Sequence, residues 1–140
     1  MKVTVHASCV AIGGRAVLIA GPSGSGKSDL ALRLIERGAS LVSDDYTILE
    51  ADFGRLLASP PGTIAGRIEV RGVGIIERPH VEAVPVALLV DLARFAERMP
   101  EPLAVEFGGV AVPAIGLSAL EASAPLKVEA ALHLHGLVQP

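Results

Sequence analysis

Apolar and polar residues alternate over positions 3–11, and a second apolar run follows over positions 16–20. The pair Gly13-Gly14 lies between these segments and suits the centre of a tight turn, so the pattern predicts a β-hairpin. With the two glycines at the turn, the pairing register places His6 opposite Gly21. The hairpin would therefore carry His6 to the start of the glycine-rich segment that follows the second strand.

Apolar residues recur at helical spacing over positions 27–37 and are followed by a glycine, which predicts a helix with a glycine stop. We expect a short buried strand at 41–42, a central strand at 86–92 and a final helix at about 125–134. These elements predict an α/β domain with a mixed β-sheet and few helices. A chain of 140 residues supports one such core, so we expect a single domain over 1–140.

The composition narrows the possible functions. A formal net charge of -3, with only three Phe and one Tyr, argues against a nucleic-acid surface. Cys9 is the only cysteine, which excludes an internal disulfide and a cysteine-rich zinc site and fits a reducing cytoplasm. No apolar run approaches the length that spans a bilayer. We therefore expect a soluble, cytoplasmic protein without membrane contact.

The segment between the predicted hairpin and the first helix matches the phosphate-binding pattern G-x-x-x-x-G-K-[ST] in full. Its residues are Gly21, Pro22, Ser23, Gly24, Ser25, Gly26, Lys27 and Ser28. Glycines let backbone N–H groups converge on phosphate oxygens, Lys27 neutralises the β and γ charges, and Ser28 can ligate magnesium. The alternative is a flexible turn before a surface helix. The complete match in a strand–loop–helix context predicts binding of a nucleoside triphosphate.

Two adjacent acids, Asp44 and Asp45, directly follow the short apolar strand. Beside a phosphate loop, Asp44 could hold magnesium directly or through water, while Asp45 could orient an acceptor hydroxyl and take its proton. The alternative is a solvated acidic turn or a helix cap. Two carboxylates next to a nucleotide site favour a division of labour between metal binding and base catalysis.

Other polar residues carry weaker signals. His6 is either a structural strand residue or a site residue, and the hairpin register favours the second reading. Glu69 and Arg71 share a face if their segment is extended, which is also what a salt-linked strand pair would show. We expect a strand over 68–76 that runs into a glycine-rich loop. The pair His133 and His135 is expected at the surface or an interface.

Taken together, the motifs resemble the catalytic domain of HPr kinase/phosphorylase, which phosphorylates a serine of the phosphocarrier protein HPr. The matching features are a histidine ahead of the phosphate loop, Arg37-Gly38 at the helix end, the Asp-Asp pair, and Glu69-Val70-Arg71-Gly72-Val73-Gly74 in place of the signature Glu-Ile-Arg-Gly-x-Gly. The resemblance is specific between residues 6 and 76. It implies a P-loop mixed-sheet fold similar to the HPr kinase C-terminal domain, and a homohexamer.

The resemblance also implies a role for each matching residue. Lys27 and the rest of the loop would bind ATP, and Ser28 and Glu69 would belong to the Mg²⁺ site. Asp45 would act as base in phosphorylation and as acid in the reverse reaction, assisted by His6. Arg71 to Gly74 would form part of the site for the HPr-like partner.

The chain departs from the family pattern in two respects. It begins almost at the catalytic strand, so it resembles the short form that consists of the catalytic domain alone. The second family signature, Pro-x-Arg-Pro-Gly-Arg-Asn, is replaced by the arginine-free segment 112–118. Phosphorolysis of phosphoserine would then need a replacement charge, for which Arg78 and Arg98 are the candidates.

The sequence thus favours an ATP- and Mg²⁺-dependent serine kinase acting on an HPr-like protein. One alternative is a P-loop kinase for a small metabolite, although no arginine-rich insertion is present to serve as its lid. A second alternative is a non-enzymatic nucleotide-sensing module, against which the Asp44-Asp45 pair argues.

Overall fold

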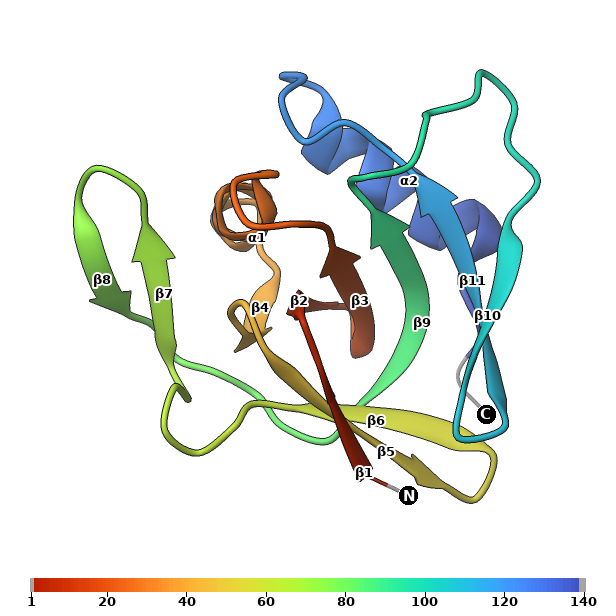
Figure 1. The fold of residues 1–140 in the computed structure, drawn as a ribbon, viewed down its shortest axis with the longest axis horizontal. Coiled ribbons are helices and arrows are strands. Elements are labelled where there is room, and N and C mark those ends of the chain that lie inside the picture. The colour runs from red at the N-terminus through yellow and green to blue at the C-terminus, as the bar shows by residue number, and fades with distance from the viewer. Residues whose placement is uncertain (1, 139–140) are drawn as a thin grey trace.

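The computed structural model describes residues 2–138 and consists of a large curled β-sheet, a separate two-stranded ribbon and two helices (Figure 1). In chain order the elements are β1 (Lys2–Val5), β2 (Ala7–Ile12), β3 (Arg15–Ala20), α1 (Lys27–Glu36), β4 (Ser40–Ser43), β5 (Thr47–Asp52), β6 (Arg55–Ser59), β7 (Arg67–Val70), β8 (Gly74–Glu77), β9 (Val84–Asp91), β10 (Leu103–Phe107), β11 (Val110–Gly116) and α2 (Ala124–His135). The α/β fold with a mixed sheet and few helices is therefore confirmed.

Strand β9 is the branch point of the sheet. The main strand order is β1-β5-β6-β9-β3-β2-β4, and β10 and β11 join through a parallel pairing of β11 with β9. One edge of β9 pairs in parallel with β3, while β6 pairs with its first residues and β11 with its last. Because β3, β9 and β11 are parallel, their carboxyl ends share one edge of the sheet. Loops that carry chemistry commonly lie at such an edge.

The predicted hairpin is confirmed in its turn and register, since β2 and β3 pair antiparallel with Ala7 opposite Ala20. The prediction that its first strand begins near residue 3 is wrong. The chain bends at His6, and the preceding β1 pairs with β5 instead. The reason is that β3 ends at Ala20, so residues before Ala7 have no partner in the hairpin and find one elsewhere.

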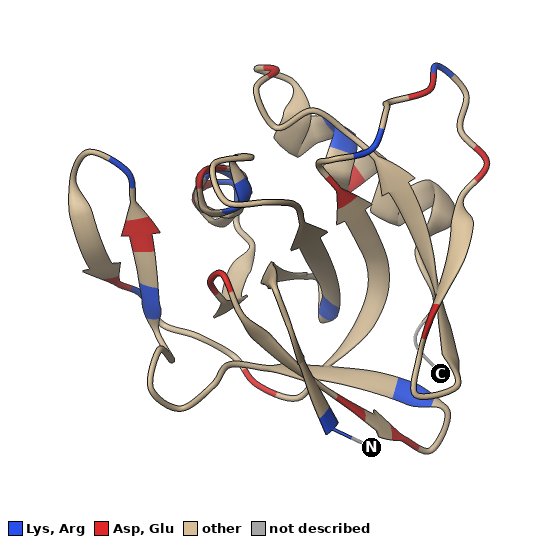
Figure 2. Cartoon of the chain, in the orientation of Figure 1, with Lys and Arg blue, Asp and Glu red and all other residues tan. Residues whose placement is uncertain are grey.

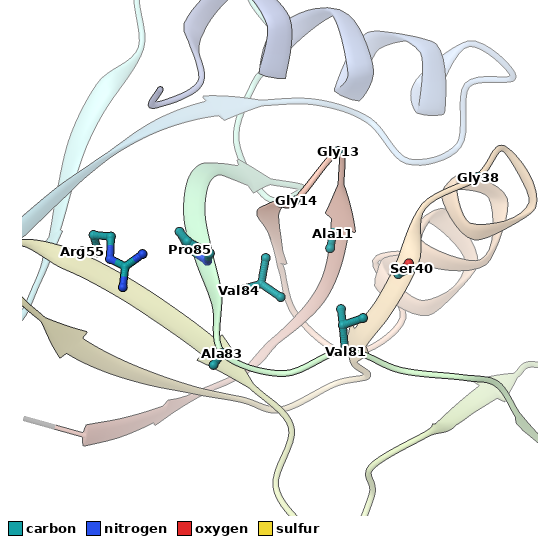
Figure 3. A pocket seen from close by; sticks show the side chains of 10 residues that line it. All are labelled: Ala11, Gly13, Gly14, Gly38, Ser40, Arg55, Val81, Ala83, Val84 and Pro85. Carbon is teal, nitrogen blue, oxygen red and sulfur yellow. The ribbon is translucent and has the colours of Figure 1, made fainter. Parts of the chain in front are cut away.

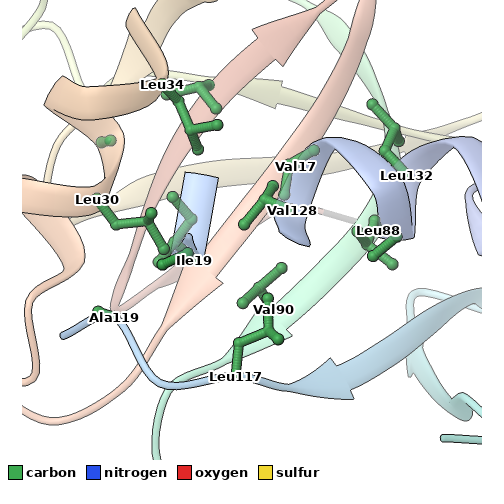
Figure 4. Close-up of a cluster of buried hydrophobic side chains, with 14 of the residues drawn as sticks. Val17, Ile19, Leu30, Leu34, Leu88, Val90, Leu117, Ala119, Val128 and Leu132 are labelled. Carbon is green, nitrogen blue, oxygen red and sulfur yellow. The ribbon is translucent and has the colours of Figure 1, made fainter. Parts of the chain in front are cut away.

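Alternation along the strands separates two apolar cores. On β3, Val17 and Ile19 face the layer that contains α1 and α2 and pack with side chains such as Leu88 (Figure 4). Leu18, the residue between them, belongs to the cluster on the other face, beneath β5 and β6. Every strand of this central hairpin is therefore buried on both sides, and the segments that leave it are held rigidly at their starting points.

The remaining elements agree with the sequence pattern except for one. α1 ends where Gly38 takes a left-handed φ of 111°, and α2 begins with proline in its first turn. Residues 68–76 were expected to form one strand entering a loop, but they form the antiparallel ribbon β7–β8. The segment that contains Gly72 and Gly74 turns the chain back, so that β8 pairs with β7 instead of continuing as an unpaired loop. Neither helix in the described range 2–138 is long and apolar enough to cross a membrane.

Candidate functional site

The glycine loop, defined here as residues 21–28, joins the end of β3 to the first turn of α1. Lys27 is 5% exposed, and its ammonium group donates to the carbonyl oxygens of Gly21 at 2.9 Å and Pro22 at 3.2 Å. The loop thus wraps around its own lysine. A buried ammonium at a helix N-terminus creates a positive site for an anion.

Side-chain-free positions are needed to fold the loop this tightly. Gly26 has φ of 98°, and a Cβ there would lie 3.0 Å from the Cβ of Ala119. The hydroxyl of Ser25 is buried and has no hydrogen-bond partner among residues 2–138. An unsatisfied donor inside a glycine-rich loop suits an anion such as a phosphate group. The loop therefore fits the triphosphate that its sequence pattern predicts.

Asp44, at the end of β4, is the centre of a hydrogen-bond network. Its Oδ1 accepts bonds from the hydroxyl of Ser28 at 2.5 Å and from the hydroxyl of Ser8 at 3.0 Å. Its Oδ2 accepts the backbone N–H of Glu69 at 2.9 Å. The side chain is nearly buried, at 7% exposure. Asp44 thus ties together the glycine loop, β2 and the β7–β8 ribbon.

Asp45 extends toward the loop from a strained backbone position. Its φ of 66° lies in the left-handed region, which is uncommon for residues other than glycine but is tolerated by Asp and Asn. Its Oδ1 lies 2.8 Å from Nε2 of His6 and 3.8 Å from Nζ of Lys27. Tyr46 stacks on the His6 ring, with centroids 5.1 Å apart. His6 is thus connected to the glycine loop through Asp45, which lies between its ring and Lys27.

The β7–β8 ribbon completes the site on the other side of α1. The Arg71 guanidinium lies 4.0 Å from the position that a Cβ on Gly24 would occupy, so it borders the glycine loop. Glu69 follows the buried Ile68 and is exposed, next to Asp44 through its backbone. Figure 2 shows the acidic residues of the β4–β5 turn and of β7, and the basic residues of α1 and the ribbon.

The donor set fits magnesium more closely than a transition metal. Ser28, Asp44 and Glu69 offer oxygen atoms only, which hard cations prefer. No group of three or more His, Cys, Asp or Glu side chains suited to a metal occurs among residues 2–138. Magnesium is commonly held by one or two carboxylates together with substrate phosphates.

Some residues named from sequence lie elsewhere. Arg78 pairs with Glu36 at the far end of α1 from Lys27, with 3.3 Å between the charged groups. Arg98 is exposed in the connection between β9 and β10, and His133 lies on the exposed side of α2. The arginine-free segment 112–118 does run to the site, because Ala119 behind it packs on the glycine loop.

Sequence reasoning missed two residues that support this site. Ser8 is fully buried and contacts both acids. Its position two residues after His6, on the polar side of an alternating strand, was the available signal. Arg33 of α1 donates to the carbonyl oxygens of Ala119 and Glu121, and so fastens the segment that backs Gly26. Nothing in the helical pattern distinguishes it from a solvated arginine.

A surface hollow at the opposite end of the β2–β3 hairpin is not part of the site. It is lined by the Gly13-Gly14 turn, Ser40, Val81 and the neighbouring strands, with Arg55 as its one charged residue (Figure 3). Arg55 itself lies 3.8 Å from Asp52. The hollow is lined by no carboxylate, and Ser40 is its only hydroxyl among residues 2–138, so the glycine loop and the acid pair remain the better candidate site.

Known proteins match both the sequence and the fold. The family model for the HPr Serine kinase C-terminal domain matches residues 1–82. The HPr kinase/phosphorylase of Clostridium tetani is 45% identical over 77 residues, which are 55% of this chain and 25% of that protein. The enzyme of the same name from Lactococcus lactis subsp. lactis is 36% identical over 126 residues, covering 80% of this chain and 41% of the relative.

A solved structure extends the match to almost the whole fold. The structure of the Hpr(Ser) kinase/phosphatase from Coxiella burnetii superposes with a TM-score of 0.81 at 34% identity, covering 94% of this chain and 95% of that one. The chain nevertheless spans only about a quarter of the length of the Clostridium tetani relative. Because the family model covers more than half of the chain and the fold agrees, this chain belongs to the HPr serine kinase C-terminal domain family.

Proposed function

We propose that this chain is the catalytic domain of a serine kinase, which uses ATP and Mg²⁺ to phosphorylate a serine of an HPr-like phosphocarrier protein. The observation that carries the proposal is the position of Asp45, whose carboxylate contacts His6 and lies 3.8 Å from the Lys27 ammonium. This position would suit a base that acts beside a phosphate-binding loop. The names of the relatives, HPr kinase/phosphorylase, support the choice of acceptor.

The glycine loop and two cations would bind the phosphate groups. Backbone N–H groups of the loop and the N-terminus of α1 favour the anion, and Lys27 neutralises its charge. Arg71 lies beside Gly24 of the same loop. Phosphoryl transfer depends mainly on alignment and charge stabilisation, to which both cations would contribute.

Ser28, Asp44 and Glu69 would hold the metal. Mg²⁺, when bound, would neutralise negative charge that develops on the phosphate groups. The Ser28 hydroxyl donates its proton to Asp44, so its lone pairs remain free for a cation. Asp44 already accepts three hydrogen bonds and is nearly buried. We therefore assign it the role of orienting Ser28 and acting on the metal through water.

Asp45 would take the proton of the acceptor serine. Its side chain is half exposed, at 50%, and so remains reachable by a protein substrate. The His6 ring N–H can donate to the same carboxylate, and stacking on Tyr46 restricts the ring. His6 would thus keep Asp45 aimed at the acceptor. In the reverse reaction, protonated Asp45 would return the proton to the serine oxygen.

The proposal extends to phosphorolysis and to assembly. Of the arginines considered, Arg71 borders the glycine loop, whereas Arg78 is paired with Glu36. Any phosphorolysis would therefore depend on Arg71. Assembly into a homohexamer, which the family resemblance implies, is part of the same proposal and is testable by sedimentation equilibrium.

The direct test is transfer from labelled ATP and Mg²⁺ to purified HPr, with phosphoserine identified by mass spectrometry. We expect Asp45→Asn to lower kcat by about 10²- to 10⁴-fold, the usual contribution of a general base. Nucleotide affinity should stay near that of the unchanged protein. Inorganic phosphate added to the product tests reversal, and pyrophosphate replaces ATP in a parallel arm.

Asp52→Asn is the matched control, because Asp52 is a partly exposed acid in the β5–β6 turn paired only with Arg55. It should transfer phosphate at the normal rate. Transfer to a small metabolite but not to HPr would instead favour a metabolite kinase. Unchanged transfer by Asp45→Asn with intact nucleotide binding would rule out the assigned base.

A further inference from the structure

Ser8 is a buried hydroxyl that joins the two acids of the site. It has 0% exposure, and it lies on β2, which carries no other polar side chain that contacts them. The hydroxyl donates to Asp44 Oδ1 at 3.0 Å and accepts the backbone N–H of Asp45, also at 3.0 Å. One oxygen atom therefore fixes a side chain on one acid and the backbone of the next.

The turn that Ser8 supports is strained. The N–H of Tyr46 donates to the carbonyl oxygen of Asp44 at 2.7 Å, which closes a three-residue turn around Asp45. A turn of this kind with φ of 66° at its centre is rare and costs conformational energy. It persists only where surrounding contacts hold it. The Asp45 N–H at its centre is held by the Ser8 hydroxyl.

The contacts of the Asp45 side chain give this turn its importance. That carboxylate is half exposed, and among residues 2–138 it contacts His6 and, at longer range, Lys27. Its direction therefore depends on the backbone from which it extends as well as on these two side chains. The backbone in turn depends on the anchor at its N–H.

We propose that Ser8 is a positioning residue for phosphoryl transfer, which acts by holding the Asp44–Asp45 turn in the conformation that aims Asp45. The inference rests on the proposed function of Asp45 as base. Ser8 is buried beneath the acids and does not reach the acceptor. Its effect should therefore appear in the chemical step and not in the binding of nucleotide or acceptor.

Thr47 provides a matched control. It is also fully buried, and its hydroxyl donates to the carbonyl oxygen of Ala7 at 2.7 Å, but it contacts neither acid. Thr47→Val and Ser8→Ala each remove one buried hydroxyl from neighbouring strands. If any buried hydroxyl group were needed equally, the two variants would lose similar amounts of kcat. If Ser8 acts by positioning Asp45, Ser8→Ala should lose much more kcat than Thr47→Val.

The kinetic test compares the two variants in transfer to HPr. We expect Ser8→Ala to lower kcat by about 100-fold, as small displacements of catalytic groups do, with KM and nucleotide Kd unchanged within about twofold. Thr47→Val should keep kcat within about twofold. In an Asp45→Asn background, Ser8→Ala should cause no further loss, because the two changes act on one group. Equal losses in Ser8→Ala and Thr47→Val, or additive losses in the double variant, would overturn the inference.

A second measurement does not depend on activity, and its first part uses only the unchanged protein. In the unchanged protein, the Asp45 amide should show slow hydrogen exchange, because the buried Ser8 hydroxyl accepts its bond. In folded Ser8→Ala, that protection and the His6 imidazole resonance should both change, while Thr47→Val leaves them unaltered. A freely exchanging Asp45 amide in the unchanged protein would overturn the inference. If the unchanged protein transfers no phosphate, the proposed function fails, and the exchange result then decides only whether Ser8 holds the Asp44–Asp45 turn.

Discussion

Cys9 illustrates how far environment alters chemistry from one residue to the next. It follows Ser8 on β2 but faces the opposite side of the sheet, in the apolar cluster that includes Leu18 and Val42. Complete burial raises the pKa of the Cys9 thiol far above its ordinary value of 9.0, because the thiolate would lose its hydration. The thiol is therefore inert in the folded protein, and its role is packing.

This burial predicts a defined dependence of stability on pH. Above about pH 9 the unfolded thiol loses its proton while the folded one keeps it, so alkali favours unfolding. The free energy of unfolding should fall between pH 7.5 and pH 10 by about 1.4 kcal/mol more in the unchanged protein than in Cys9→Ala. Urea titrations at both pH values measure this difference. An identical pH dependence in the two proteins would contradict it.

Sequence reasoning identified residues whose chemistry is tied to a contiguous pattern. The glycine loop was singled out because its eight positions form one motif, and Asp44-Asp45 because the two acids follow an apolar strand in a chain that carries this motif. Ser8 and Arg33 were not recognised, because each depends on distant partners. Ser8 meets acids 36 and 37 residues away, and Arg33 meets a carbonyl oxygen 86 residues away. Such contacts follow from topology and not from local spacing.

At the scale of elements, α1 and the segment after β11 act as one support for the glycine loop. Arg33 donates to the carbonyl oxygens of Ala119 and Glu121, and it also pairs with Asp29 at 3.0 Å. Ala119 in turn packs where a Cβ on Gly26 would lie. The hydrogen bonds of Arg33 therefore help to hold Ala119 in place against Gly26 of the glycine loop.

Arg33→Met tests this support. The methionine keeps much of the apolar side chain but removes the Arg33 donor from the Ala119 carbonyl oxygen and one of two donors from the Glu121 carbonyl oxygen, which should lower the unfolding free energy by about 1–2 kcal/mol. Nucleotide Kd should rise, because Ala119 is no longer fastened. The control is Arg37→Met, which breaks an exposed pair with Glu129 at the other end of the helix and should leave the unfolding free energy nearly unchanged, because exposed ion pairs contribute little. Equal nucleotide affinity in both variants would contradict the proposed support.

The elements themselves were largely predictable, and the exceptions concern pairing. Alternation identified the residues of β1 and β2 as extended but could not show that the chain bends at His6. That break depends on the availability of β5 as a partner for β1. Residues 68–76 likewise carry strand and glycine signals, and their folding into a ribbon follows from hydrogen bonding between β7 and β8. The local residue pattern determines that a segment is extended, whereas the rest of the fold determines which strand it pairs with.

At the scale of the whole molecule, β9 connects the two halves of the sheet. It pairs with β3 along one edge and with both β6 and β11 along the other. The two apolar cores lie on opposite faces of the strands that it joins. This arrangement supports our proposal that residues 1–140 form one domain that unfolds as a unit.

Leu88→Ala in β9 tests this cooperativity. Leu88 is fully buried among the residues that face the helices, and its truncation should lower the unfolding free energy by about 2–5 kcal/mol. Helix loss by circular dichroism and exposure of the Cys9 thiol on the opposite face should shift together in urea. Leu134→Ala, at a position 74% exposed, should change stability by less than about 0.5 kcal/mol. Two separate transitions would refute a single domain.

The bend at His6 places this residue between two strand pairings in different parts of the sheet. The residues before it belong to the β5 edge, while those after it belong to the strand beside β3. A movement of one part against the other would draw the His6 imidazole away from the Asp45 carboxylate. The contact between this ring and this carboxylate therefore depends on how β1 is paired with β5.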